Sequence, residues 1–182
     1  MISFRPDARE WAEIQAEAKQ ARLTGWRSNV REDEARRVSM LDEDRVVGLL
    51  GEWALSLCLT GTAEAFWETR AARAERPWAS DDGEDLLGVP WDAKASRMRY
   101  SKDPLSYSLL VRDSEIRDGH RYACALVAFD WSAVHLVGYA TSEEVRAAFR
   151  RPGRVRGSAG PHEIPAAKLH SMPFGVEGLV RW

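Results

Sequence analysis

Three residues near the middle of the chain have the types and spacing of a site that cuts phosphodiesters with the help of a metal ion. Asp85 stands shortly before Asp92-Ala93-Lys94. Such cleavage needs a nucleophilic water, relief of charge on the phosphate and help for the leaving oxygen. A hard divalent cation held by carboxylates supplies all three.

The predicted strands bring these groups together. Asp85 and Asp92 fall on adjacent strands joined by a tight turn, so their carboxylates can converge. Side chains alternate along a strand, so Lys94 points the same way as Asp92 and lies beside the metal. There its ammonium contacts the scissile phosphate or orients the attacking water, and the carbonyl of Ala93 is a further candidate ligand. The ordinary alternatives are a turn-capping aspartate for Asp85 and a solvated lysine for Lys94.

Glu52 is a third candidate carboxylate. It is the sole charged residue between Arg45 and Glu64, in a stretch that reads as a mostly buried helix. A buried carboxylate is destabilising by several kcal/mol unless it is paired or bound to a metal. We therefore expect a metal-ligand role for Glu52, with two alternatives: an ion pair with an arginine from elsewhere, or simple exposure.

Taken together, these motifs resemble a known enzyme superfamily. A Gly-x-x-Gly-Glu-x-Ala helix containing Glu52, then Asp85, then Asp92-x-Lys94 is similar to the pattern of the PD-(D/E)xK nucleases. The resemblance covers about residues 46–139. Glu84 stands where the motif name has proline, which is a common variation.

The resemblance implies a restriction-endonuclease-like α/β fold, in which helices flank a mixed sheet with core order αβββαβ. It also implies Mg²⁺-dependent DNA cleavage, with Mn²⁺ able to substitute, that leaves a 5′-phosphate. Glu52, Asp85 and Asp92 would then be metal ligands, and Lys94 would be catalytic. Many nucleases of this type act as dimers, so a homodimer is also expected, although no segment identifies an interface.

Three further interpretations concern the type of nuclease, its substrate and a non-catalytic alternative. The Gln-x-x-x-Tyr motif of the exonuclease-like branch is absent, because the only glutamines are Gln15 and Gln20. This favours an endonuclease or junction-resolving enzyme. An RNA-directed nuclease would use the same site, so the sequence does not distinguish an RNA substrate from a DNA substrate. The rival class is a non-catalytic nuclease-like module that binds DNA or protein.

The remaining elements form one predicted domain over residues 1–182, with a core of about 39–150. The predicted helices are 7–23, a capped helix from Ser39 to about Leu59, a short helix in 113–119, and one from Thr141 to about Phe149. The predicted strands are 84–89, 90–96, 107–111, 122–129 and 134–139. Residues 62–76 read as a linking region, and 151–182 as an irregular tail with one short helix near Ala166.

Basic residues after the Asp-x-Lys strand and in one later run are the candidate DNA contacts. Phosphate contacts of this kind give affinity without sequence specificity. A solvated arginine-rich loop is the alternative for the later run. The candidates are Arg97, Arg99, Lys102, Arg150, Arg151 and Arg154.

Composition adds broad limits. A length of 182 residues suits one domain, and a formal net charge of −2 is no global signal for nucleic-acid binding. Cys58 and Cys124 lie in apolar runs and are expected to be buried thiols. The polar start of the chain and the lack of a long apolar run predict an intracellular, cytoplasmic protein with no membrane partner.

Overall fold

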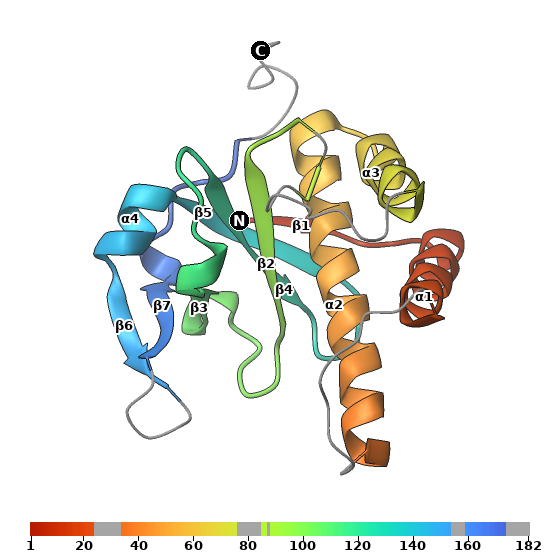
Figure 1. Cartoon of the computed structure of the whole chain (residues 1–182), viewed down its shortest axis with the longest axis horizontal. Helices are drawn as coiled ribbons and strands as arrows, with labels where there is room; N and C mark the ends of the chain where they lie inside the picture. Colours follow the sequence, from red (N-terminus) through yellow and green to blue (C-terminus); the bar gives the residue numbers. More distant parts are fainter. Residues whose placement is uncertain (24–33, 76–84, 87, 154–158, 174–182) are drawn as a thin grey trace.

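The computed structural model describes residues 1–23, 34–75, 85–86, 88–153 and 159–173. Within these ranges the chain is mixed α/β, as predicted (Figure 1). The helices are α1 (Ala8–Leu23), α2 (Glu34–Thr60), α3 (Glu64–Glu75) and α4 (Ser142–Ala147), with short 3-10 turns η1 (Pro104–Ser106), η2 (Asp113–Glu115) and η3 (Ala166–Lys168). The strands are β1 (Ile2–Phe4), β2 (Trp91–Arg97), β3 (Ser108–Val111), β4 (Arg121–Val127), β5 (Val134–Thr141), β6 (Phe149–Pro152) and β7 (Ala159–Pro165).

These elements form three layers. A four-stranded sheet of order β1-β5-β4-β2 lies in the middle, with α1, α2 and α3 on one face (Figure 1). A smaller sheet of order β3-β7-β6 lies on the other side together with α4. The α/β class is thus observed, but the single mixed sheet of the prediction is divided into two.

β4 shows why the middle sheet is buried on both faces. Its residues alternate between two apolar clusters: Ala123 and Ala125 belong to the cluster under the helices, whereas Tyr122 and Cys124 belong to the cluster under the small sheet. A strand covered on both sides reads as a continuous apolar run. β2 lies beside β4 in parallel, with Ala93 opposite Ala123, and is the edge strand of the sheet.

Several predicted boundaries were wrong. α2 begins at Glu34 rather than at Ser39, because Glu, Ala and Arg residues before the capping pattern extend the helix. The linking region contains α3, whose Ala-, Glu- and Arg-rich sequence is typical of helix. The helix predicted to reach Phe149 ends at Ala147, although its capping box at Thr141 is confirmed.

Two further corrections concern strands. The strand predicted over 84–89 is a tight turn in its described residues, with only an isolated bridge between Leu86 and Val89. The tail predicted as irregular contains the second half of β6 and all of β7, whose prolines and glycine hide the strand pattern. The short helix near Ala166 is confirmed as η3.

Both cysteines are buried free thiols, as predicted. Burial raises the pKa of Cys58 to about 11 and that of Cys124 to about 12. Within the described part of the chain, no helix is both long and apolar enough to cross a membrane.

Gly51 allows α2 to lie directly on β2 and β4. A Cβ at this position would meet the Cβ of Ala95 at 2.7 Å and that of Ala125 at 3.3 Å. The three small residues therefore set the depth at which α2 packs. Because Glu52 follows Gly51, this contact also fixes the height of Glu52 above the sheet.

We expect Gly51→Ala to destabilise the fold, because the added methyl group forces α2 away from β2. Overpacking of this kind is destabilising by about 1–3 kcal/mol. The matched control is Gly48→Ala one turn earlier, where a Cβ meets nothing within 4 Å. That substitution should stabilise α2 by roughly 0.5–1 kcal/mol. Urea unfolding of both variants checks the pair, and equal effects would contradict this account of the packing.

Candidate functional site

Asp85 lies against the free edge of β2. The N–H of Ala93 donates to Asp85 Oδ2 at 2.5 Å, and the N–H of Asp85 donates to the carbonyl of Trp91 at 3.1 Å. Gly88, at φ +71°, provides the left-handed turn that returns the chain to β2. The N–H and C=O of one strand residue point to the same side, so the carbonyl of Ala93 also faces this edge.

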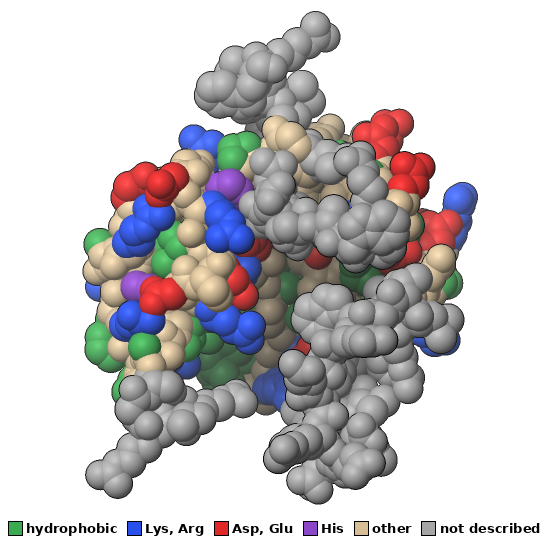
Figure 2. All heavy atoms as spheres, in the orientation of Figure 1, with side chains coloured by type: hydrophobic (Ala, Val, Ile, Leu, Met, Phe, Trp, Pro, Cys, Tyr) green, Lys and Arg blue, Asp and Glu red, His purple; other side chains and the backbone are tan. Residues whose placement is uncertain are grey.

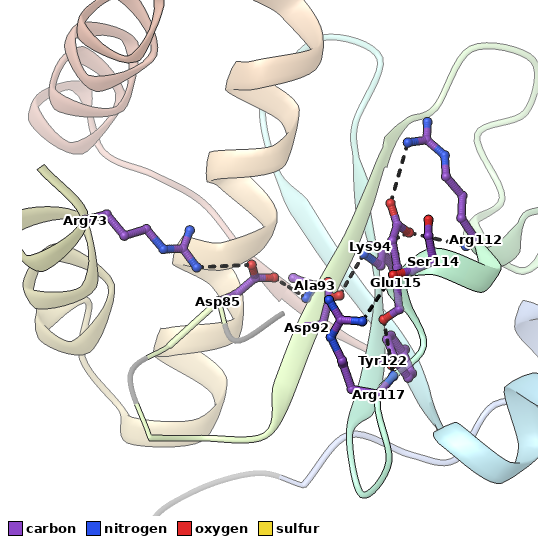
Figure 3. Close-up of polar contacts among 10 residues, drawn as sticks. All are labelled: Arg73, Asp85, Asp92, Ala93, Lys94, Arg112, Ser114, Glu115, Arg117 and Tyr122. Carbon is purple, nitrogen blue, oxygen red and sulfur yellow. Dashed lines mark hydrogen bonds and ion pairs between the residues drawn. The ribbon is translucent and has the colours of Figure 1, made fainter. Parts of the chain in front are cut away.

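Asp92 and Lys94 lie on the face of β2 that looks toward the small sheet. Their side chains form an ion pair of 2.7 Å, which confirms that they point the same way. On its other side Lys94 meets Glu115 of η2 at 3.1 Å (Figure 3). The lysine is therefore held between two carboxylates, and its side chain is only 21% exposed.

Tyr122 of β4 holds η2 in place for this contact. The N–H of Arg117 donates to the Tyr122 hydroxyl at 2.7 Å, and this hydroxyl donates to the carbonyl of Glu115 at 3.0 Å (Figure 3). Because Tyr122 is buried in the sheet, η2 cannot shift without moving this side chain. Glu115 is thus a positioned neighbour of Lys94.

Glu52 forms an ion pair with arginine, which was one of the two alternatives predicted for this residue. Arg70 of α3 meets Glu52 at 2.5 Å, and Arg73 meets the same oxygen at 3.8 Å. Arg73 also lies 3.9 Å from Asp85 Oδ1. The two arginines neutralise the acidic groups between α2 and the edge of β2, and Arg73 links Glu52 to Asp85.

The carboxylates influence one another through charge. Burial, then the charges of Glu52 and Asp92, raise the pKa of Asp85 well above its usual range, against the opposing effects of the Ala93 N–H and Arg73. Burial also raises the pKa of Asp92, although Lys94 and a hydrogen bond with Asp85 act in the other direction. The two aspartates therefore retain a proton at a pH where ordinary carboxyl groups have lost theirs.

Lys94 remains a cation at this site. Burial lowers its pKa, but the charges and hydrogen bonds of Asp92 and Glu115 outweigh burial and raise the pKa above its usual value. At neutral pH the side chain therefore acts as a positive charge and hydrogen-bond donor, and not as a base.

The residues fit a divalent cation in donor chemistry but not as a complete cage. Among the described residues, no three acidic, histidine or cysteine side chains are grouped so as to hold a metal ion. Mg²⁺ is usually held by only one or two carboxylates, together with waters and substrate phosphates. Asp85, Asp92 and the carbonyl of Ala93 match this smaller set, whereas Glu52 would first have to release Arg70.

The predicted DNA contacts lie in three different settings. Arg97 points to the helix face, where it pairs with Glu43 at 3.0 Å and lies over the ring of Trp131. Arg150 and Arg151 are paired with Asp113 and Glu163 respectively. Arg99 and Lys102 are exposed and form no ion pair with any described residue, and Arg154 lies outside the described residues.

Four residues that contact the predicted site were not singled out from the sequence: Arg70, Arg73, Glu115 and Tyr122. The helix-forming composition of α3 was the signal that could have placed the two arginines on one element. Nothing in the sequence links η2 to Lys94. Figure 2 shows acidic, basic and histidine side chains intermingled over the small sheet and α4, rather than one basic field.

Comparisons with known proteins do not assign the chain to a family. No protein-family model, no curated protein and no solved structure matches it. The site itself is therefore the evidence that bears on function.

We expect Asp85→Asn to raise the melting temperature (Tm) at pH 8 in buffer with EDTA. The raised pKa means that the folded protein holds a proton that the unfolded chain has already released. Stability is then lost as pH rises from the ordinary carboxyl pKa through the raised one. Asparagine still accepts from the Ala93 N–H and avoids this loss, so Tm should rise by roughly 2–4 °C for each kcal/mol regained.

At pH 4 the variant and the wild type should melt alike, since the carboxyl is then protonated in the folded state. Asp44→Asn, an exposed carboxylate on α2, is the control and should change Tm little at either pH. A gain for Asp85→Asn that is equal at pH 4 and pH 8 would refute the charge argument.

Proposed function

We propose that the chain is a divalent-metal-dependent nuclease that hydrolyses DNA phosphodiester bonds, as an endonuclease or junction-resolving enzyme with a restriction-endonuclease-like core. The observation that carries the proposal is the proximity of Asp85, at the free edge of β2, to Asp92 and Lys94 on the adjoining face of the same strand (Figure 3). The order α2, Asp85, β2 and the parallel pairing of β2 with β4 are in keeping with such a core. The small sheet on the opposite face is a departure from the predicted core.

The bound Mg²⁺ would supply charge neutralisation and an activated water. Asp85 and Asp92 would hold it through their oxygens, and the carbonyl of Ala93 is placed to add a further ligand. Loading the site requires Asp85 and Asp92 to lose the protons that their raised pKa values retain. Glu52 adds negative charge behind this pair and is a third ligand only if Arg70 withdraws.

Lys94 would contact the phosphate that is cut. Its ammonium is cationic and held by Asp92 and Glu115, so it can donate to a non-bridging phosphate oxygen. Water oxygen forms a new bond to phosphorus in line with the bond to the 3′ oxygen, which breaks. The attacking water loses one proton to solvent. The departing 3′ oxygen takes up a proton from solvent, so the products carry a 5′-phosphate and a 3′-hydroxyl.

One observation favours the non-catalytic alternative. Arg70 and Arg73 already neutralise Glu52, and Arg73 also approaches Asp85, as a protein that never binds a cation would require. In that case the chain would be a nuclease-like module for binding DNA or protein. Binding would then survive substitution of Asp92 and Lys94, and no cleavage would accompany it.

The first test of catalysis is cleavage of supercoiled, linear, single-stranded and four-way-junction DNA, and of RNA, in Mg²⁺ or Mn²⁺. We expect cutting that EDTA abolishes and that Lys94→Ala lowers by about 10²–10³-fold, since a transition-state donor is lost. Lys168→Ala, an exposed lysine of η3, should cut normally. If the folded protein cuts none of these substrates, the proposal is contradicted.

A second test measures metal binding without catalysis. Millimolar Mg²⁺ or Mn²⁺ should raise Tm, because a ligand present at ten times its Kd stabilises the folded state by about 1.4 kcal/mol. EDTA should remove the gain, and Asp92→Asn should lack it, whereas the exposed-site variant Asp44→Asn should keep it. Equal metal responses in all these proteins would rule out Asp92 as a ligand.

A further inference from the structure

The loop after β2 is built around one tyrosine hydroxyl. We call residues 99–107 the tyrosine loop. The backbone N–H groups of Arg99, Tyr100 and Ser101 point at the Tyr107 hydroxyl at 2.8, 3.1 and 3.1 Å, and this hydroxyl donates to the carbonyl of Ser101 at 3.0 Å. Tyr107 itself is buried. The loop is therefore held in one conformation by a core side chain.

This arrangement presents an aromatic ring to solvent. Tyr100 stacks on Tyr107 with ring centroids 4.3 Å apart and an interplanar angle of 26°, and its hydroxyl donates to the carbonyl of Ser106 at 3.3 Å. Even so, Tyr100 is 73% exposed. One face of the ring is fixed against Tyr107, and the opposite face is free.

The charges beside this ring are suited to phosphates. Arg99 and Lys102 flank Tyr100 in sequence, are exposed, and pair with no carboxylate in the described part of the chain. The acidic groups nearby have other partners: Asp103 accepts from the Leu105 N–H at 3.0 Å as the cap of η1, and Glu163 is paired with Arg151. Asp130, on whose carboxylate the charge of Lys102 acts, accepts from the Ser132 hydroxyl at 2.6 Å. An aromatic ring between unpaired cations is the arrangement that binds bases and backbone of single strands.

The tyrosine loop also lies on the same side of β2 as Lys94. Met98, the residue before the loop, belongs with Tyr107 to the cluster under the small sheet, which is the face that carries Asp92 and Lys94. Lys94 and Met98 are four positions apart along the chain, about 13 Å at the usual rise of a strand. This distance corresponds to roughly four nucleotides of a B-form strand.

We propose that the tyrosine loop is a binding surface for an unpaired nucleotide, with a base stacked on Tyr100 and its phosphates contacted by Arg99 and Lys102. The inference deepens the proposed function, because it takes nucleic acid as the partner and assigns the enzyme a substrate with a single-stranded segment. Since the Tyr107 hydroxyl already fixes the loop backbone and its ring stacks on Tyr100, little ordering accompanies binding.

The test measures binding of a fluorescein-labelled thymidine oligomer of about 12 nucleotides by anisotropy, in EDTA so that no cleavage occurs. We expect Tyr100→Ala to weaken binding roughly 5- to 150-fold, the usual range for loss of one base–aromatic stack. Tyr100→Phe keeps the ring and should bind like the wild type. Leu105→Ala, which removes an exposed apolar side chain from the same loop, is the control and should also bind like the wild type.

An oligomer of equal length in which abasic spacers replace the nucleotides separates stacking from charge. It retains the phosphates, so Tyr100→Ala should not change its affinity. Equal losses on both oligomers, or no loss on the thymidine oligomer, would overturn the inference. So would tighter binding of a blunt duplex than of the thymidine oligomer.

The outcomes for the proposed function are distinct. If the protein cleaves DNA with metal but its affinity for the thymidine oligomer does not depend on Tyr100, this inference is wrong and the proposed nuclease function stands. If binding of the thymidine oligomer depends on Tyr100 but the protein cleaves no substrate, this inference is supported and the proposed nuclease function is wrong.

Discussion

Buried negative charge at the free edge of β2 is the constraint on which the rest of the structure depends. Asp85, Asp92 and Glu52 are all largely withdrawn from water, and an unpaired buried carboxylate is destabilising by several kcal/mol. The compensating cations come from two elements: Lys94 from β2 itself, and the arginines from α3. Packing of α3 on α2 brings Arg70 and Arg73 to these carboxylates, which gives the polar composition of this helix a structural role.

β2 serves as the common support of the three layers. Gly51 of α2 packs closely on one face of β2, and Asp92 and Lys94 point from the opposite face toward η2. Asp85 covers the unpaired edge of the strand. An exposed edge strand invites pairing with another chain, and the turn that carries Asp85 blocks this edge. The same turn thus protects the sheet and supplies an acidic group to the candidate site.

The two arginines of α3 define what metal binding would require. Arg70 holds Glu52 at 2.5 Å, whereas Arg73 is 3.9 Å from Asp85. The closer pair ties Glu52 to α3, and the longer one leaves Asp85 oriented by the Ala93 N–H. A cation at the aspartates would therefore compete mainly with the protons that their raised pKa values retain and with Arg73. The tyrosine loop continues the same strand, so substrate contact and chemistry would depend on one element.

The sequence by itself determined the local part of this site. Alternation along a strand was sufficient to place Asp92 and Lys94 on one face, the glycine before Val89 indicated the turn, and a lone Glu52 in an apolar helix predicted a buried charge in need of a partner. These are short-range consequences of backbone geometry and solvation. Only the tertiary structure decided that the partner is Arg70, that Glu115 holds Lys94, and that residues 159–165 pair with β3 despite their prolines. Such contacts join elements far apart in the chain. They are selected because the packed fold must satisfy buried charges and backbone groups, and a local sequence pattern contains no information about them.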